Sequence, residues 1–194
     1  MGSGRCTLPG YGHVTPYQQG ELSGLCGVYS AINAARLLSP ELATQRALWI
    51  DLYRYAVQWL GEQGRLRSGL VHGLSYDLWK ELQHAIHDEL SCKRGISYRM
   101  RPLIRRRTRV PGSDPAAHVR QALQEGRPVL CALAGELDHY TVIAGHTHSR
   151  WLLHDSYGYR WVAKRTTAFE HAQGERHCIP LSTLMVLYRS ENQS

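Results

Sequence analysis

The spacing of apolar residues changes near residue 95, and this change limits the possible folds more than any other feature of the chain. Before it, apolar residues recur at helical spacing; after it, short strand-like runs are separated by turn residues. Helices first and strands second are typical of an α+β domain with a mainly antiparallel sheet. The 194 residues are expected to form a single domain over 1–194, with a helical half over 5–94 and a β half over 95–190.

Three helices are expected in the first half. The first begins at Cys26 and ends near Leu38. Ser39-Pro40-Glu41, a capping residue followed by a proline and an acid, predicts a second helix that ends near Leu60. The third follows Ser75, and the four glycines within Gly61–Gly73 predict a loop before it.

The second half predicts one short helix and six strands. Asp114-Pro115 starts the helix, which is expected to end at Gly126. The strands are expected over Ile96–Met100, Val129–Ala134, Tyr140–Ala144, Trp151–His154, Tyr159–Val162 and Leu184–Tyr188.

Cys26 is the first candidate for chemistry because it opens an apolar helix. A thiol at a helix N-terminus faces the positive end of the helix dipole and unpaired N–H groups, which favour the thiolate. A thiolate nucleophile needs an imidazole partner, and the imidazole needs a group that fixes its tautomer. His139 and Asp155 supply both groups in two strand-like runs. A buried, inert thiol is the alternative for any cysteine in an apolar run, and we expect it for Cys131 and Cys92.

The pairing of His139 with Asp155 follows from an assumed hairpin. If the chain turns after Ala144 with Ala144 opposite Arg150, then His139 lies opposite Asp155. Directly opposed Cβ atoms of an antiparallel pair are about 4.5–5.5 Å apart, close enough for a carboxylate to accept a hydrogen bond from an imidazole. Because side chains alternate along a strand, His154 is expected to point away from both.

Three short motifs together resemble the papain-like superfamily of cysteine peptidases. They are Cys26-Gly27, His139-Tyr140-Thr141-Val142-Ile143 and His154-Asp155-Ser156-Tyr157-Gly158. Within that superfamily, the chain is most similar to the bacterial peptidase C39-like group. The resemblance implies a helical half that carries the nucleophile, a β half that carries His and Asp, and a cleft between them. It also implies a bacterial origin and tolerance of small residues such as glycine before the scissile bond.

The resemblance also implies a glutamine in the oxyanion hole, and here the chain departs from the family pattern. That glutamine usually lies five or six residues before the cysteine, whereas Gln19 lies seven and Gln18 eight residues before Cys26. The usual positions hold Gly20 and Glu21, whose side chains cannot donate a hydrogen bond as an amide does. Gln19 is therefore the predicted donor, with Gln18 as its substitute, and the backbone N–H of Cys26 is the second donor.

These residues predict a cysteine peptidase or isopeptidase that uses a Cys26-His139-Asp155 triad and a thioester intermediate. No cofactor is expected for this reaction, and its partner would be a peptide or protein substrate. An acyltransferase or transglutaminase would use the same triad. A catalytically inactive basic module that binds an acidic protein or nucleic acid is the alternative outside enzymes.

The net charge of +7 raises the question of an acidic partner. The densest basic run spans Arg99–Arg109 and is interpreted as a solvated surface, with binding of an acidic partner as the alternative. No aromatic residue interrupts that run, which argues against single-stranded nucleic acid. A zinc site formed by His146, His148 and His177-Cys178 is a less favoured alternative, because the first two lie in an expected turn.

The five cysteines favour a cytoplasmic protein. They are odd in number, widely spaced and form no Cys-x-x-Cys pair, so reduced thiols are expected. No apolar stretch reaches the ~18 residues of a membrane-spanning helix. Met1–Gly4 resembles residues left by cloning, which could have replaced a native signal peptide. A secreted effector is therefore kept as the alternative to a cytoplasmic protein.

Overall fold

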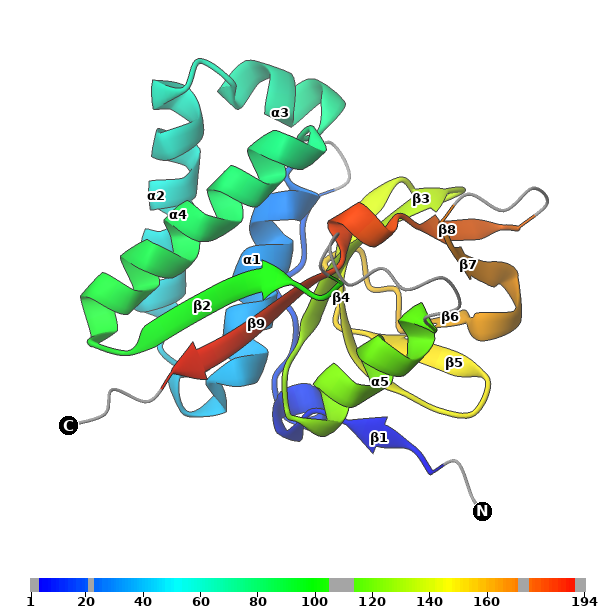
Figure 1. Cartoon of the computed structure of the whole chain (residues 1–194). Helices are drawn as coiled ribbons and strands as arrows, with labels where there is room; N and C mark the ends of the chain where they lie inside the picture. Colours follow the sequence, from blue (N-terminus) through cyan, green and yellow to red (C-terminus); the bar gives the residue numbers. More distant parts are fainter. Residues whose placement is uncertain (1–3, 21–22, 105–113, 171–174, 191–194) are drawn as a thin grey trace.

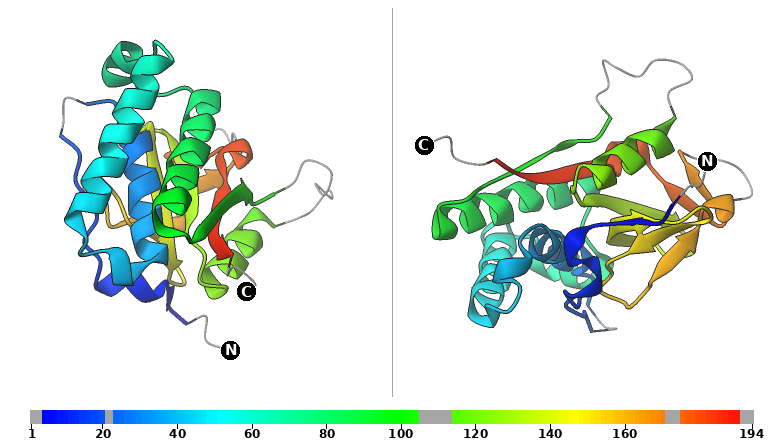
Figure 2. Two further views of the ribbon diagram at one scale, coloured as in Figure 1. Left: turned by 90° about the vertical axis from the view of Figure 1, so that its left-hand side faces the viewer. Right: turned by 90° about the horizontal axis from the view of Figure 1, so that it is seen from below.

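The computed structural model describes residues 4–20, 23–104, 114–170 and 175–190. The α+β class is confirmed, because four helices pack on one side of the chain and a mainly antiparallel sheet forms the other (Figure 1). The view from below shows the two halves as adjacent layers (Figure 2). Strands β2 (Ser97–Pro102) and β9 (Met185–Ser190) cross from the sheet to the helical half, where β2 packs against helix α4 (Tyr76–Arg94).

The helices of the first half are α1, α2, α3 and α4, and one further helix, α5, follows β2. The bounds are Cys26–Leu38 for α1, Arg46–Glu62 for α2, Leu66–His72 for α3, Tyr76–Arg94 for α4 and Pro115–Gln124 for α5. The predicted bounds of α1 are confirmed. The predicted starts of α4 after Ser75 and of α5 at Asp114-Pro115 are confirmed as well. There the side chains of Ser75 and Asp114 cap the helices by accepting backbone hydrogen bonds from Leu78 and Ala116.

Two expectations for the helical half are wrong. The second helix begins at Arg46 rather than beside Ser39, because Pro40–Leu42 forms a separate 3₁₀ turn and the Ser39 hydroxyl hydrogen-bonds the hydroxyl of Tyr98 instead of capping a helix. The segment expected to be a loop contains α3. Two of its glycines, Gly64 and Gly73, have φ values of 66° and 77° and lie between helices, so they break the chain around α3 rather than preventing it.

Within the described residues the sheet has nine strands, with β2-β9-β3-β4-β5-β6 in spatial order. β1 pairs with β4, β8 pairs with β3, and β7 pairs with β8 as a parallel pair; all other pairs are antiparallel. The bounds are Cys6–Thr7 for β1, Ser97–Pro102 for β2, Val129–Gly135 for β3, His139–His146 for β4, Arg150–Leu153 for β5, Trp161–Ala163 for β6, Thr167–Phe169 for β7, His177–Ile179 for β8 and Met185–Ser190 for β9. The six predicted strands are present with shifted ends, and β1, β7 and β8 were not predicted.

The core surrounds α1, which packs against α2 and α4 on one side and against β4 on the other. Eleven of its thirteen residues are buried. Where α4 meets β4, the rings of Trp79 and Tyr140 stack with centroids 4.5 Å apart. The N-terminus of α1 is thereby fixed at the junction of the helical and β halves.

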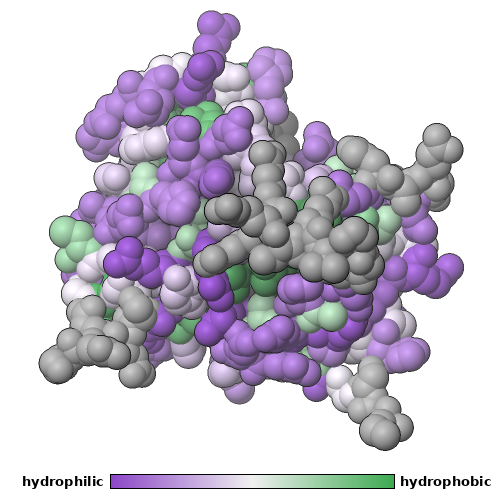
Figure 3. Space-filling model, in the orientation of Figure 1, coloured by the Kyte–Doolittle hydropathy of each residue, from purple (hydrophilic) through white to green (hydrophobic). Residues whose placement is uncertain are grey.

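The surface facing the viewer in Figure 3 is mostly hydrophilic, with small and separate apolar areas. The large hydrophobic residues that are exposed are Leu70 and Val71 of α3 and Tyr157, Tyr159 and Trp161 around the start of β6. Within the described residues, no helix is both long and apolar enough to cross a membrane.

The close packing at Gly27 yields a stability prediction. A Cβ atom at Gly27 would lie 2.6 Å from the ring of Trp79 and 2.9 Å from Leu74, whereas one at Gly61 would meet nothing within 4 Å. Helix propensity favours alanine over glycine by about 0.5–1 kcal/mol at both positions. At Gly27 the steric cost, typically about 1–3 kcal/mol, exceeds that gain.

We therefore expect Gly27→Ala to lower the free energy of unfolding by about 1–2 kcal/mol, as measured by urea denaturation. The matched control Gly61→Ala should raise it slightly. Stabilisation by both substitutions would contradict the described contact between α1 and α4.

Candidate active site

Cys26 is the first residue of α1, and its side chain faces a cleft. The residue is 8% exposed, and its sulfur lies 4.0 Å from the carbonyl oxygen of Gly24. The first N–H groups of a helix have no acceptor within the helix, so the backbone around Cys26 offers donors and the positive end of the dipole. Among the residues that the structure describes, no side chain caps this N-terminus.

The cleft has a volume of about 340 Å³ and lies between the helical and β halves. Ser23, Gly24 and Cys26 line it from the start of α1, and the end of α3 forms a wall of Leu70, Val71, His72 and Gly73. Leu137, Asp138, His139 and Tyr157 line it from the β half. Cys26 and His139 thus face the same space.

His139 begins β4, and Asp155 lies two residues beyond the end of β5. The distance between His139 Nε2 and Asp155 Oδ2 is 2.7 Å, and both side chains are almost completely buried. The other ring nitrogen of His139, Nδ1, is buried and has no hydrogen-bond partner among the described residues. Asp155 therefore binds one ring nitrogen of His139 and leaves the other unpartnered within the described ranges, and His139 and Cys26 both line the cleft.

A tight turn after Asp155 holds its carboxylate in place. Asp155 Oδ1 accepts backbone hydrogen bonds from Tyr157 at 2.8 Å and from Tyr159 at 3.2 Å, while Oδ2 faces His139. Gly158, with φ of 86°, supplies the left-handed backbone that this turn requires. The carboxylate is thus oriented from both sides before any substrate binds.

The electrostatics of the pair favour a charged imidazole. Burial lowers the pKa of His139, but the hydrogen bond to Asp155, the neighbouring Cys26 and the charges of both outweigh burial and raise the pKa to about 9. Burial raises the pKa of Asp155, but the hydrogen bond and charge of His139 outweigh it and lower the pKa below its usual value. At neutral pH His139 is therefore protonated and Asp155 ionised.

The predicted hairpin register is wrong, although His139 and Asp155 still meet. Ile143 pairs with Leu153 and His146 pairs with Trp151, with a β-bulge between Ile143 and Gly145. β4 extends to His146, where it pairs with β5 on one side and β1 on the other, so the turn lies further along the chain than predicted. Before the bulge, the observed register differs by two residues from the predicted one, and an even shift keeps the same side chains on the same face.

The buried side chain of Gln19 lies beside the cleft. Its Nε2 donates hydrogen bonds to the carbonyl of Ser23 and, at 3.0 Å, to the hydroxyl of Tyr157; both residues line the cleft. Its Oε1 accepts from Ser156 Oγ at 3.3 Å. Neither glutamine lines the cleft itself, and the Nε2 of Gln18 donates at 3.4 Å to the backbone carbonyl of Asp155, which is not a lining residue. The contacts of Gln19 with two lining residues favour Gln19 over Gln18, and Glu21 lies outside the described residues.

Sequence reasoning missed the position of Tyr157. Its ring lies 4.6 Å from the ring of His139, and its hydroxyl accepts from Gln19, which leaves the hydroxyl proton free to donate. The only signal in the sequence was its place two residues after Asp155.

The wall formed by α3 was also missed. The carbonyl of Leu70 accepts a hydrogen bond from the N–H of Gly24 at 2.9 Å, which attaches α3 to the segment before Cys26. A Cβ atom at Gly24 would collide with the backbone of Gly69 and Gly73, so this contact requires glycine.

The remaining candidates lie away from the cleft. All five cysteines are free; Cys131 and Cys178 are buried, and burial raises the pKa of both thiols. Cys92 is exposed, contrary to the expectation that it is buried. His154 is buried, and the positive charge of Arg36 adds to burial in lowering its pKa to about 3.

No cluster of three or more His, Cys, Asp or Glu side chains able to hold a metal ion occurs in the described part of the chain. Of the basic run, Arg99 and Arg101 are exposed on β2, while residues 105–109 lie outside the described residues.

No model of a protein family matches the sequence, and a search of curated proteins finds no significant match. The geometry of the cleft is therefore the basis on which a function is inferred.

Proposed function

We propose that this protein is a cysteine hydrolase that cleaves a peptide or isopeptide bond, with Cys26 as nucleophile, His139 as acid and base, and Asp155 as the orienting carboxylate. The observation that carries the proposal is the buried His139–Asp155 pair, with the free ring nitrogen of His139 in the same cleft as Cys26. Thiol catalysis requires a nucleophile, a base that can reach it, and a group that orients the base.

The reaction follows from the charges of the site. The imidazolium of His139 stabilises the thiolate of Cys26, which attacks the substrate carbonyl carbon. The resulting oxyanion accepts hydrogen bonds from the backbone N–H of Cys26 and from Gln19. Both Nε2 protons of Gln19 are engaged, so Gln19 has to exchange its bond to Ser23 or Tyr157 for one to the oxyanion; the hydroxyl of Tyr157 is the alternative donor.

Collapse of the tetrahedral intermediate breaks the C–N bond. His139 gives its proton to the leaving amine, and the acyl group remains on Cys26 as a thioester. His139 then takes a proton from water, which attacks the thioester and releases the carboxylic acid product. Cys26 and His139 return to their starting state, and no step requires a cofactor.

The arrangement of the halves supports the finer proposal of a papain-like fold. α1 places Cys26 at the edge of the helical half, and the sheet places His139 and Asp155 across the cleft. This is the division of residues that the sequence resemblance implies. Either water or an amine can attack the same thioester, so the activity test below distinguishes a hydrolase from an acyltransferase. The same test identifies a binding module without activity.

The proposed ion pair predicts which cysteine reacts first. At neutral pH, iodoacetamide should modify Cys26 at least about tenfold faster than the other four cysteines, because an unperturbed thiol is only a few per cent thiolate. Mass spectrometry of each cysteine-containing peptide measures this. Cys92 is the critical comparison, because it is exposed whereas Cys26 is 8% exposed. Faster labelling of Cys92 would contradict activation of Cys26.

The pH dependence of that reaction reports on His139. Its raised pKa of about 9 means that the proton stays on the ring from neutral pH up to about pH 9 and is lost above it. The alkylation rate of Cys26 should therefore be level near neutral pH and rise as pH passes 9, where the thiolate loses its imidazolium partner. In His139→Ala the level region near neutral pH should be lost, because an ordinary thiol gains thiolate as the pH rises toward its usual pKa of about 8.5, and the neutral rate should fall. A level region that persists in this variant would exclude His139 as its origin.

Turnover should depend unequally on the three residues. We expect Cys26→Ala to abolish cleavage and His139→Ala to lower kcat/KM by about 10³-fold or more, because the acid and the base are lost together. Asp155→Ala should retain more activity than His139→Ala, since only the orientation of the ring is lost. The substrates are a panel of peptides and ubiquitin-like proteins with glycine before the scissile bond, assayed with and without a primary amine.

The control is His154→Ala, which should leave kcat/KM largely intact where circular dichroism shows a folded variant. An inactive His154→Ala together with a fully active Asp155→Ala would overturn the triad. Products that carry the added amine would identify an acyltransferase. A wild-type protein without activity would favour the alternative of a catalytically inactive binding module.

A further inference from the structure

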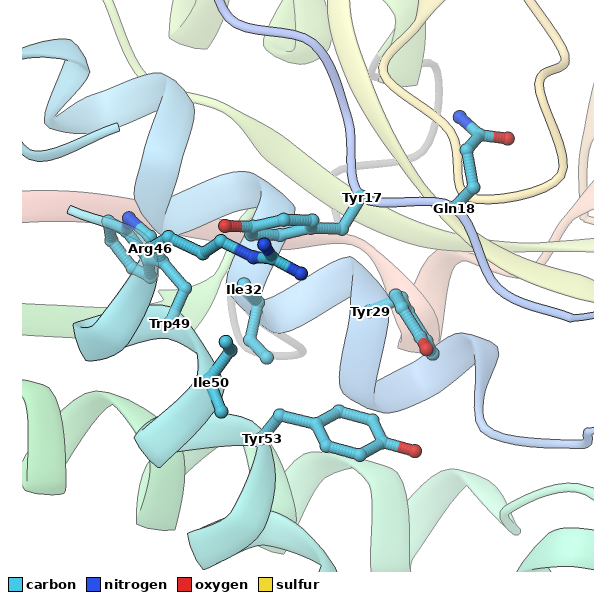
Figure 4. A pocket seen from close by; sticks show the side chains of 8 residues that line it. All are labelled: Tyr17, Gln18, Tyr29, Ile32, Arg46, Trp49, Ile50 and Tyr53. Carbon is cyan, nitrogen blue, oxygen red and sulfur yellow. The ribbon is translucent and has the colours of Figure 1, made fainter. Parts of the chain in front are cut away.

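A second hollow, with a volume of about 220 Å³, lies between α1, α2 and the segment that contains Tyr17 and Gln18 (Figure 4). It shares no lining residue with the Cys26 cleft. We call it the aromatic pocket, and its lining consists of Tyr17, Gln18, Tyr29, Ile32, Arg46, Trp49, Ile50 and Tyr53.

Aromatic and apolar side chains form most of this pocket. The rings of Tyr29 and Tyr53 lie 5.6 Å apart at an angle of 54°, and Figure 4 shows Ile32 and Ile50 beside them. Trp49 is buried and donates its indole N–H to the carbonyl of Leu42. Such a lining favours a planar apolar guest.

Arg46 adds a positive charge that is not neutralised. It is the first residue of α2, it is exposed, and its guanidinium forms no ion pair or hydrogen bond with any residue that the structure describes. Figure 4 shows its side chain reaching toward Tyr17. The nearby Arg36 is different, since it is buried and donates to the carbonyls of Thr15 and Ala43. A carboxylate on the guest would find a free bidentate partner in Arg46.

The aromatic pocket lies close to the cleft along the chain and in space. Tyr29 follows Cys26 by three residues on α1, less than one helical turn of about 5.4 Å. Gln18, at the rim, donates to the carbonyl of Asp155. Because an extended chain covers about 3.3 Å per residue, a polypeptide with its reacting carbonyl at Cys26 can reach the pocket within a few residues.

We propose that the aromatic pocket is a second binding site, which takes one aromatic side chain of a polypeptide substrate while Arg46 binds a carboxylate of the same polypeptide. This rests on the proposed function for its assignment to a substrate. The volume supports a side chain, since sites for whole small molecules usually exceed about 300 Å³. The substrate class is thus a polypeptide with an aromatic residue and an acidic residue at fixed distances from the scissile bond.

The first experiment measures binding without catalysis. N-acetyl-tryptophan carries an aromatic ring and a carboxylate, and N-acetyl-tryptophanamide is its uncharged counterpart. In an NMR titration, both should shift the signals of Tyr17, Tyr29 and Ile50 in a saturable way, and the acid should bind about threefold more tightly, as expected for an exposed ion pair. Shifts elsewhere, or equal affinity of the two probes, would overturn the pocket or the role of Arg46.

Three variants separate the contributions. Arg46→Gln should remove the preference for the acid and leave the amide unaffected; Arg46 is exposed, so folding should not depend on it. Ile50→Trp should fill the pocket and abolish binding of both probes. Arg54→Gln is the matched control, because Arg54 lies on the same helix, is ion-paired with Asp51 and does not line the pocket.

The second experiment tests the link to the substrate. A library of peptides is incubated with the wild type, with Cys26→Ala and with the three variants, and the cleavage sites are read by mass spectrometry. Enrichment of an aromatic residue and an acidic residue at fixed positions is expected for the wild type and for Arg54→Gln. In Arg46→Gln the acidic preference should disappear, and in Ile50→Trp the aromatic one.

The outcomes distinguish this proposal from the proposed function. Alkylation of Cys26 by iodoacetamide should proceed at the same rate in all three variants, since the triad is untouched. Cleavage without aromatic enrichment would overturn the substrate site while the hydrolase stands, and probe binding alone would then assign the pocket to a small aromatic acid. A Cys26 that neither reacts nor cleaves would overturn the proposed function and the substrate site with it.

Discussion

The burial of α1 is the constraint on which the rest of the structure depends. A helix enclosed by α2, α4 and β4 has to satisfy its polar groups locally, and it does so through specific partners. Gln83 donates to the carbonyl of Gly27 at 2.8 Å, Trp79 donates to Ser30 Oγ at 3.3 Å, and Asn33 exchanges hydrogen bonds with the backbone of Tyr17. These contacts fix both the rotation and the axial position of α1. They therefore fix the direction in which Cys26 leaves its first turn.

The β half constrains the partner side chain by a different means. Each oxygen of the Asp155 carboxylate has its own donors: the imidazole on one, and two backbone N–H groups on the other. A carboxylate held in this way cannot rotate without breaking hydrogen bonds in a buried site, where unpaired polar groups are costly. Imidazole orientation is thus built into the turn after β5. The thiol, with the carbonyl of Gly24 4.0 Å away, is the less constrained partner.

Local patterns predicted the elements well, and non-local pairing was not predictable. The bounds of α1, the starts of α4 and α5 and the six predicted strands follow from helical spacing, helix-start signals and strand-like runs within a few residues. The predicted hairpin register was wrong because β4 pairs with β5 as far as His146 and contains a β-bulge between Ile143 and Gly145, and no local pattern marks either feature. The predicted pairing of His139 with Asp155 was still correct, because a register shift of two residues keeps both side chains on the same face of the sheet. The approach of α3 to Gly24 and the hydrogen bond from Gln19 to Tyr157 depend on tertiary packing, which no spacing in the sequence encodes.

The segment Tyr17–Gln19 connects the proposed sites mechanically. It is bound to α1 through the two hydrogen bonds between Tyr17 and Asn33, and to the β half through Gln18, whose amide donates to the carbonyl of Asp155, and the N–H of Gln19, which donates to the carbonyl of Ser156. A guest in the aromatic pocket would rest on Tyr17, one end of this segment. At the other end, Gln19 has to exchange a hydrogen bond before it can serve an oxyanion. A guest at Tyr17 and an oxyanion at Gln19 would thus contact the two ends of one three-residue segment, and remote contacts raise kcat only where they favour the transition state over the bound substrate.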